Sequence, residues 1–387
     1  MKRKSILVLI SIILYLGLIL TGCGNGSAPA QSQSKDSGMA ATPEFTWKFQ
    51  VVHNPEQMDY KMFVEACDEV YKATNGRMKI DLYPSGSFAS SMEAFQACGE
   101  GVFEMHSSWP SYVKGIEYAF IPIADGNMSM GPLDRMIFLE QGGGKELMQE
   151  AFDKVNLQFM SYRIWPPDTL ASRFDFKSIA EMEGKKMRTS APDIAVSQGI
   201  SAITLPIEEV FTAMASGAVD MLENCYLSYN KDLGITEIAP YGIYPDFWNC
   251  SFVETVVVNK DAWAKLPDDI KLIMKSVFDA KMMNVFAKAE IASAQDLKEL
   301  SESKEVSFRR LDAEQFKDMR QDMMEIEARE RAKQGEDSLT AKTYDTIYNF
   351  YETYYPYKEL TSHWSTGLTA SEAAGFDIPK YHKDANE

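Results

Sequence analysis

Two arginines are the side chains best suited to recognise a charged ligand. Arg173 and Arg188 bracket a segment typical of a turn, a short capped helix and a strand whose outer end carries Arg188. An enclosed carboxylate needs a partner, because a buried lone ion costs far more free energy than a few hydrogen bonds return. Arginine suits this better than lysine, since its planar fork donates two parallel hydrogen bonds and stays charged. Both arginines are candidates for binding an anionic group, although Arg188 could form a surface salt bridge and Arg173 could fix the loop or meet a second anionic group.

Other polar and aromatic candidates lie where predicted strands end. Asn224 follows an apolar strand over 219–222, and His53 and His106 end two other predicted strands. Either histidine could instead be a structural residue with satisfied hydrogen bonds. Aromatic side chains usually pack in cores, but several around one crevice would shape a slot for an organic acid with an apolar body. The aromatic residues near these strand ends are Trp109, Tyr112, Tyr226, Phe247 and Trp248.

The order of predicted elements favours an α/β fold, because strand and helix signals alternate along the chain. A helix, a glycine stop and an apolar strand over 93–105 are matched in type by 209–221, which favours two lobes built alike. Strands near 157–164 and 252–258 would cross between the lobes, and ligands of such sheets bind in the crevice at the carboxyl ends of strands. The first unit is βαβαβ, with strands over 47–52, 78–83 and 102–107 and helices over 57–74 and 91–98.

A long helix is expected to brace both lobes. No glycine or proline occurs between Asp268 and Gln334, so the pattern predicts one helix over 261–303, which is longer than a single lobe. The resulting divisions are 46–163 and 254–300 for lobe I, 164–253 and 301–345 for lobe II, and 346–387 for a helical C-terminal tail.

The N-terminus resembles a bacterial lipoprotein signal peptide. Three basic residues at 2–4 precede an apolar run over 6–20, and Leu20-Thr21-Gly22 leads to Cys23, the expected site of cleavage and acylation. A transmembrane anchor is the alternative, but the apolar run ends short of the roughly 20 residues that a spanning helix needs. Residues 23–45 are small and polar, which is typical of a flexible tether. We therefore expect residues 1–22 to be removed and the mature protein to be anchored by lipid outside the cell.

Composition disfavours some binding partners but does not determine whether the cysteines form disulfides. The formal net charge of −17 disfavours binding to nucleic acid or anionic lipid headgroups. A buried site with its own arginine can still bind an anion. The remaining cysteines could form two disulfides or none, and their spacings do not resemble a zinc site. They are Cys67, Cys98, Cys225 and Cys250.

The ordered combination of motifs resembles the solute receptors of tripartite ATP-independent periplasmic (TRAP) transporters over about residues 46–345. The block from Arg173 through a short helix to Gly184-Lys185 and Arg188 is similar to the arginine, short-helix, Gly-Lys-x-x-Arg pattern of that family. Further landmarks in the same order are Tyr83-Pro84-Ser85-Gly86-Ser87, 96–105, Gly142-Gly143-Gly144, Leu205-Pro206, 208–220, Glu223-Asn224 and 258–263.

The resemblance implies a two-lobed fold like that of periplasmic binding proteins, which closes on a small organic carboxylate and delivers it to a permease. It also implies that the permease has two membrane subunits and uses a sodium gradient. By resemblance, Arg188 would hold the substrate carboxylate through a bidentate salt bridge, and Asn224 would hydrogen-bond the ligand. No covalent chemistry is needed, so we expect a binding protein and no enzyme.

The branch of the family that binds 2-oxo acids or lactate through a metal is similar in overall pattern, but this chain departs from it at the metal ligands. The branch's glutamine falls near Pro167, its Glu-Trp pair is Glu223-Asn224, and its later glutamate falls near Asn249 or Cys250. Glu223 alone is too little for calcium, which takes six or more oxygen ligands. We expect Glu223 to face the ligand and no metal or other cofactor to be required.

Two rival functions remain at this point. A secreted hydrolase or lyase is weakened because the sequence has no Gly-x-Ser-x-Gly elbow, His-Glu-x-x-His helix or phosphate loop, and only four histidines. A sensor would present its loaded form to a signalling partner in place of a permease. The sequence leaves open the identity of the carboxylate, the oligomeric state, the disulfide pairing and whether the host has one membrane or two.

Overall fold

The structure is a computed structural model, and it describes residues 42–125, 130–190, 192–246, 251–310 and 313–361 of the 387-residue chain. The leader, Cys23, most of the tether, Phe247, Trp248, Cys250 and the tail beyond Thr361 lie outside the described residues. The three cysteines that can be placed, Cys67, Cys98 and Cys225, are buried free thiols.

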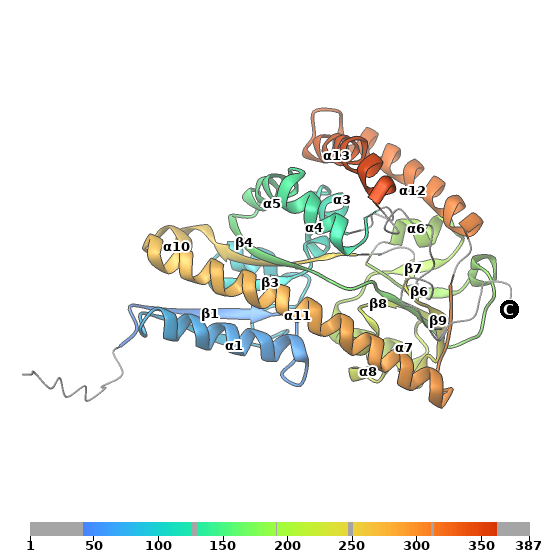
Figure 1. Cartoon of the computed structure of the whole chain (residues 1–387), viewed down its shortest axis with the longest axis horizontal. Helices are drawn as coiled ribbons and strands as arrows, with labels where there is room; N and C mark the ends of the chain where they lie inside the picture. The colour runs from blue at the N-terminus through green and yellow to red at the C-terminus, as the bar shows by residue number, and fades with distance from the viewer. Residues whose placement is uncertain (1–41, 126–129, 191, 247–250, 311–312, 362–387) are drawn as a thin grey trace, which may run out of the picture. The chain divides into compact units, whose positions relative to one another are not determined.

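The first sheet has five strands in the order β2-β1-β3-β10-β4 (Figure 1). Strand β1 pairs in parallel with β2 and β3, whereas β10 runs antiparallel to both of its neighbours, β3 and β4. Helix α1 (Met58–Ala73) packs against this sheet, and its Phe63 meets Phe49 of β1 edge to face at 5.2 Å between ring centroids. The strands are β1 (Phe45–Val51), β2 (Met78–Tyr83), β3 (Met105–Ser108), β4 (Leu157–Ile164) and β10 (Val253–Asn259).

The second sheet has six strands in the order β11-β9-β5-β8-β6-β7. Its centre combines an antiparallel pair, β5 with β8, and a parallel pair, β8 with β6. The strands are β5 (Thr169–Ser172), β6 (Lys186–Arg188), β7 (Ser201–Ile203), β8 (Met221–Asn224), β9 (Tyr241–Ile243) and β11 (Ser307–Arg309). The expected two-sheet α/β arrangement is therefore confirmed, and we call the surroundings of the two sheets the first and second lobes.

The long helix contacts both lobes, as predicted, but it begins later than expected. The segment predicted as one helix is divided into α10 (Lys260–Ala264) and α11 (Asp268–Ser303), because Pro267 lacks the N–H that a continuous helix requires. Along α11, Phe278 packs in the core of the first lobe, and Leu300 packs with Leu227 and Phe308 in the second. Figure 1 shows this helix running past both sheets.

The helix–glycine–strand units that suggested similar lobes occupy corresponding places in the two sheets. Helix α2 (Ala94–Gly99) leads into β3, and α7 (Val210–Ser216) leads into β8. Each connection turns at a glycine in the left-handed region, Gly101 at φ +81° and Gly217 at φ +76°. A side chain there would strain the backbone. Both units deliver an interior strand to its sheet.

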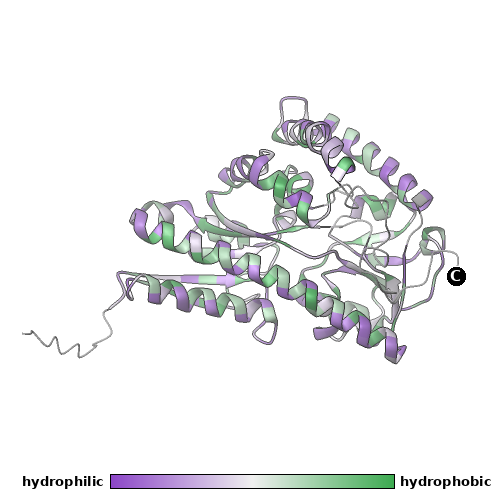
Figure 2. Ribbon diagram, viewed as in Figure 1, coloured by the Kyte–Doolittle hydropathy of each residue, from purple (hydrophilic) through white to green (hydrophobic). Residues whose placement is uncertain are grey.

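The remaining helices cover the sheets with their apolar sides, and Figure 2 shows hydrophilic and hydrophobic residues alternating along them. Phe350 of α13 packs on Phe138 of α4, so this C-terminal helix covers the first lobe, and Met319 and Met323 of α12 pack on the second. None of the helices within the described ranges has both the length and the apolarity to cross a membrane. The other helices are η1 (Pro110–Val113), α3 (Phe120–Ala124), α4 (Pro132–Gln141), α5 (Gly144–Asp153), η2 (Ile179–Met182), α6 (Pro192–Ser197), η3 (Ile207–Glu209), α8 (Leu227–Asp232), α9 (Ile235–Ile238), α12 (Ala313–Gln334) and α13 (Leu339–Thr361).

Candidate functional site

Arg188 is the last residue of β6, an interior strand of the second sheet. Its neighbour Met187 packs in the core of that lobe, and Arg188 itself is only 4% exposed. The backbone of Arg188 lies opposite Leu222 of β8, so the next residues of β8, Glu223 and Asn224, reach the same edge of the sheet. The carboxyl ends of two parallel strands thus bring an arginine, a glutamate and an asparagine together.

Neutral oxygen atoms accept the hydrogen bonds of the Arg188 guanidinium. Nε and Nη2 donate to the Leu205 carbonyl at 3.2 and 3.0 Å, and Nη1 donates to the Glu223 carbonyl at 3.1 Å. The remaining two bonds are longer, both 3.4 Å, from Nη1 to Oδ1 of Asn224 and from Nη2 to the hydroxyl of Tyr112. The three shorter bonds therefore fix the orientation of the side chain. The two longer bonds, to Asn224 and Tyr112, could be replaced by bonds to a ligand.

Arg188 lines a small cavity of about 30 Å³ between residues of both lobes. The first lobe contributes residues from η1 and its neighbours, and the second contributes the ends of β6 and β8 and the start of β5. Of the sequence-predicted ligand contacts, the structure brings five to this cavity: Arg188, Asn224, Glu223, Tyr112 and Trp109. The lining residues not predicted are Ser111, Asp125, Asp168, Ser190, Cys225 and Phe252.

The aromatic side of the cavity comes mainly from the first lobe. Trp109 and Tyr112 meet edge to face at 5.7 Å between ring centroids, and Phe252 lies 6.2 Å from Trp109. Burial raises the pKa of the Tyr112 hydroxyl, so this group stays protonated and can donate a hydrogen bond at neutral pH. The cavity therefore combines an apolar wall with a buried guanidinium, an arrangement that suits a small organic acid.

Carboxyl groups form the other polar side of the cavity. Asp168, 4% exposed, precedes β5 and hydrogen-bonds the carboxyl group of Glu223, which is 1% exposed. Burial raises the pKa of Asp168 well above its ordinary value, and the charges of Glu223, Asp246 and Asp125 raise it further. Glu223 also accepts a hydrogen bond of 2.9 Å from the backbone N–H of Ser190. Asp168 is thus a buried carboxyl group whose ionised form is disfavoured by its surroundings.

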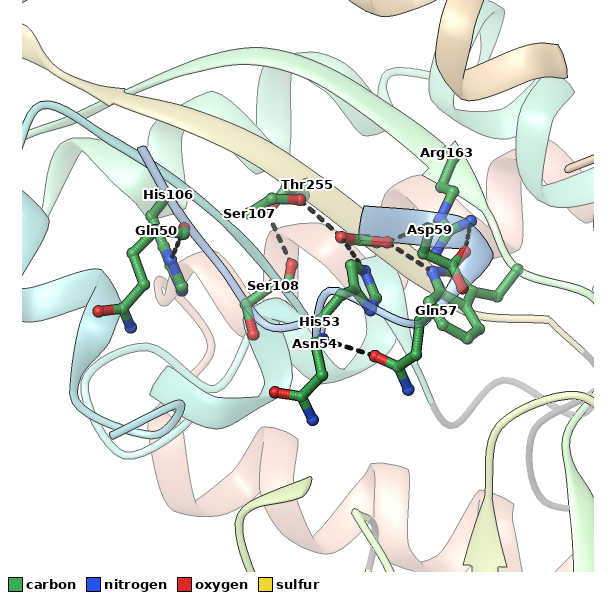
Figure 3. Close-up of polar contacts among 12 residues, drawn as sticks. Gln50, His53, Asn54, Gln57, Asp59, His106, Ser107, Ser108, Arg163 and Thr255 are labelled. Carbon is green, nitrogen blue, oxygen red and sulfur yellow. Dashed lines mark hydrogen bonds and ion pairs between the residues drawn. The ribbon is translucent and has the colours of Figure 1, made fainter. Parts of the chain in front are cut away.

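His53 and His106 are buried behind the cavity and do not line it. His53 follows β1, and its Nε2 lies 2.9 Å from Oε1 of Glu254 in β10. His106 lies within β3, where its Nδ1 is 2.8 Å from the Gln50 carbonyl, apart from the His53 cluster (Figure 3). Burial lowers the pKa of His106 to about 4, so this ring is neutral at physiological pH. Both histidines have structural partners, which was the alternative reading of each.

The His53 cluster is built on a buried guanidinium, that of Arg163 in β4 (Figure 3). Arg163 forms ion pairs with Asp59 and with Glu254, the latter at 2.7 Å from Nε to Oε2. Its guanidinium carbon also lies 4.1 Å from the centre of the Trp165 ring. The Tyr226 hydroxyl of the second lobe donates to Asp59 of the first at 2.9 Å. We call Arg163, Glu254, Asp59 and His53 the β4 charge network.

Arg173 is not brought to the cavity. It follows β5, which runs antiparallel to β8, so that Ser172 lies opposite Met221 while Thr169 lies opposite Asn224. Arg173 therefore leaves the sheet at the edge opposite the cavity, where it is exposed. We do not retain it among the proposed ligand contacts.

Asp168 is the functional candidate that sequence reasoning missed. It is one of 56 acidic residues, and its type and spacing carry no signal. The available clue was its position directly before a strand, at the edge where β8 ends. Within the described parts of the chain, no three His, Cys, Asp or Glu side chains are grouped so as to hold a metal ion.

Comparison with known proteins assigns the chain to a family. The profile of the family described as "Bacterial extracellular solute-binding protein, family 7" (DctP) matches residues 49–334. The chain belongs to this family. It is therefore an extracytoplasmic solute-binding protein, a member of a family of receptors that bind their solutes without transforming them.

Individual relatives of this solute-binding protein are distant in sequence. A monocarboxylate 2-oxoacid-binding periplasmic protein of Nostoc sp. is 25% identical over 210 residues, which cover 54% of this chain and 58% of the relative's length. A TRAP transporter solute-binding protein of Bordetella bronchiseptica, with copurified calcium and picolinate, has a TM-score of 0.78 at 18% identity and covers 86% of this chain and 99% of its own. One from Pseudoalteromonas atlantica, with bound sodium and pyruvate, has a TM-score of 0.76 at 21% identity, with the same coverage. At these identities the two structures establish the fold.

Proposed function

We propose that this protein is the lipid-anchored receptor of a TRAP transporter and that Arg188 binds the carboxylate of a small organic acid. The observation that carries the proposal is the buried Arg188 guanidinium in the cavity between the lobes. The relatives support a carboxylate ligand, because their ligands include 2-oxoacids, picolinate and pyruvate. The carboxylates of picolinate and pyruvate are accompanied by a metal ion in those two structures.

The geometry indicates how a carboxylate would enter. Its two oxygens would replace Oδ1 of Asn224 on Nη1 and the Tyr112 hydroxyl on Nη2, the partners of the two 3.4 Å bonds. The bonds to Leu205 would persist and hold the fork in place. Released from Arg188, the Tyr112 hydroxyl and the Asn224 amide could both bind the ligand. Since Tyr112 belongs to the first lobe and Arg188 to the second, a ligand that contacts both would favour the closed arrangement.

Delivery to a permease and the lipid anchor follow from the family and from the leader sequence. A membrane-tethered receptor needs no spanning helix of its own, since acyl chains on Cys23 would hold it at the surface. The permease partner, with two membrane subunits and a sodium gradient, is proposed from family membership.

Calorimetry with a panel of organic acids tests the proposal. The Arg188→Ala variant should bind the best acid about 3 to 5 kcal/mol more weakly, the usual cost of removing one partner of a buried charge pair. Arg173→Ala is the matched control, because it removes the same charge from the exposed edge of the same lobe and should leave affinity unchanged. A loss of less than about tenfold for Arg188→Ala would count against its role.

A further inference from the structure

The charges of the cavity restrict the ligand more than a lone arginine would. Apart from Arg188, the ionisable groups that line the cavity among the described residues are Asp125, Asp168 and Glu223, with the thiol of Cys225 and the hydroxyl of Tyr112. A ligand with a carboxylate alone would add a further negative charge to a site already rich in carboxyl groups. Like charges brought together in a poorly solvated site repel strongly.

We propose that the ligand is an amino acid, with its carboxylate on Arg188 and its protonated amino group on Asp168. This inference rests on the proposed function of Arg188 and specifies the class of solute. It adds a second ligand contact, Asp168, which the family motifs did not indicate.

One oxygen of the Asp168 carboxyl group lacks a hydrogen-bond donor among the described residues. Asp168 is 4% exposed, it lines the cavity, and its Oδ1 receives no hydrogen bond from any N–H or O–H of the described residues. A buried carboxyl oxygen without a donor is costly, and native structures usually satisfy such groups. A ligand ammonium would supply both the missing donor and the missing positive charge. With Asp168 paired in this way, Glu223 would be relieved of the like charge beside it.

The sheet places the two contacts on opposite sides of one strand. Arg188 lies opposite Leu222 on one side of β8, and Thr169, the residue after Asp168, lies opposite Asn224 on the other. Because neighbouring strands are about 4.8 Å apart, the two backbones are separated by about 10 Å. Both side chains line the same cavity, so a ligand with charges of opposite sign would meet Arg188 on one side of β8 and Asp168 on the other once the lobes separate enough to admit it.

An ammonium fits these residues better than a metal ion. Calcium takes six or more oxygen ligands, and the described part of the chain has no group of three potential metal-ligating side chains. An ammonium carries three donors and can be satisfied by one carboxylate and neutral oxygens. Asp168 offers such a carboxylate, and the hydroxyl groups of Ser111 and Tyr112 line the same cavity.

Calorimetry with matched ligands tests the inference, because each set keeps the carbon skeleton and changes only the second group. The probes are alanine, lactate and pyruvate; leucine, 2-hydroxy-4-methylpentanoate and 4-methyl-2-oxopentanoate; and phenylalanine, phenyllactate and phenylpyruvate. The wild type should bind the amino member of its preferred set at least about tenfold more tightly than the other two, as expected for a charge-assisted hydrogen bond. Asp168→Asn should remove that preference and change the affinity for the hydroxy and oxo members less than about threefold. Asp318→Asn, which neutralises an exposed carboxylate on α12, should change neither.

The outcomes separate this inference from the proposed function. Equal or tighter binding of the oxo or hydroxy member, or an equal loss for all three in Asp168→Asn, would overturn the inference while leaving Arg188 as the carboxylate site. Binding that requires calcium or sodium and is abolished by a chelator or by sodium removal would overturn it in favour of a metal. If Arg188→Ala binds every probe normally, the proposed function itself fails.

A measurement without ligand completes the test. Neutralising a repelled carboxylate should stabilise the empty protein, so Asp168→Asn should raise its melting temperature by a few degrees. If the melting temperature of Asp168→Asn is unchanged or lower and the wild type binds none of the probes, the inference is overturned.

Discussion

The two lobes each bury an arginine at the interior of a sheet, and the two arginines have opposite kinds of partner. Arg163 in β4 pairs with the carboxylates of Asp59 and Glu254. Arg188 in β6 donates to two backbone carbonyls, an amide oxygen and a phenol. The carboxyl groups nearest to Arg188 face the cavity together with it. Arg163, whose charge is neutralised within the protein, stabilises the fold. Arg188 is held in place by neutral groups, so its charge can pair with that of a ligand.

The pKa shifts of the neighbouring acids express the same difference. In the β4 charge network, burial acts to raise the pKa of Glu254, but the charges of Arg163 and His53 outweigh it and hold this pKa well below its usual range. In the cavity, burial and the nearby acids both raise the pKa of Asp168. Glu254 therefore stabilises the fold as a carboxylate, whereas ionised Asp168 destabilises it.

Of the changes that distinguish the two arginines, the loss of Arg163 should have the greatest effect on stability. We expect Arg163→Met to lower the free energy of unfolding by about 3 to 5 kcal/mol, because Glu254 and Asp59 would remain buried without their cation. Urea unfolding followed by circular dichroism measures the change. Arg188→Met is the matched control and should cost markedly less stability in the absence of ligand, since its partners are neutral. A loss below about 1 kcal/mol for Arg163→Met would remove the distinction between the two arginines.

A smaller effect concerns His106, a buried base in β3. Its ring packs edge-on against Phe95 at 4.7 Å between centroids, and burial lowers its pKa to about 4. Between pH 6.5 and 4 the unfolded chain takes up a proton at this residue and the folded protein does not, so stability falls as the pH falls. From pH 7 to 4.5 the expected contribution is a loss of about 2 kcal/mol.

Comparison with His106→Gln isolates this contribution, because a glutamine can still donate to the Gln50 carbonyl. The difference in unfolding free energy between the two proteins, measured by urea titration at pH 7 and at 4.5, should change by about 2 kcal/mol in favour of the variant. The carboxylates titrate in both proteins and largely cancel. Parallel pH profiles would mean that His106 is protonated in the folded state or solvated there.

Much of the fold could be predicted from sequence because local patterns determine it. The alternation of strand and helix signals indicated the order of elements in the first lobe, and glycine stops marked the ends of α2 and α7. The break before α11 was missed although Pro267 lies within the helix predicted over 261–303. A proline can separate two helices, as Pro267 does, or stand in the first turn of a single one. Which of these occurs depends on how the two segments pack on the sheet.

The site was predictable only in part, because residue type does not determine strand direction. Arg173 and Arg188 occur in one motif and are chemically equal. Only the antiparallel pairing of β5 with β8 sends Arg173 to the far edge. His53 lies near its predicted strand end, but the fold buries it against Glu254, which is 201 residues away in sequence. Asp168 became a candidate only when its burial and its lack of a donor were visible.

The smallest predicted effect concerns the junction between the two lobes. Glu208 of the second lobe accepts hydrogen bonds from Ser91 of the first, at 3.2 Å from the backbone N–H and 2.6 Å from the hydroxyl. This contact would stabilise the arrangement in which Tyr112 and Arg188 meet across the cavity. Its loss should therefore lower the affinity for a ligand that contacts both residues. We expect Glu208→Ala to lower ligand affinity by about 1 kcal/mol, roughly fivefold, with dissociation becoming faster. Glu209→Ala is the matched control, since Glu209 is the adjacent exposed acid. Equal affinities for the two variants would mean that the other contacts between the lobes, such as the Tyr226–Asp59 hydrogen bond, are sufficient, and that the cavity closes without this one.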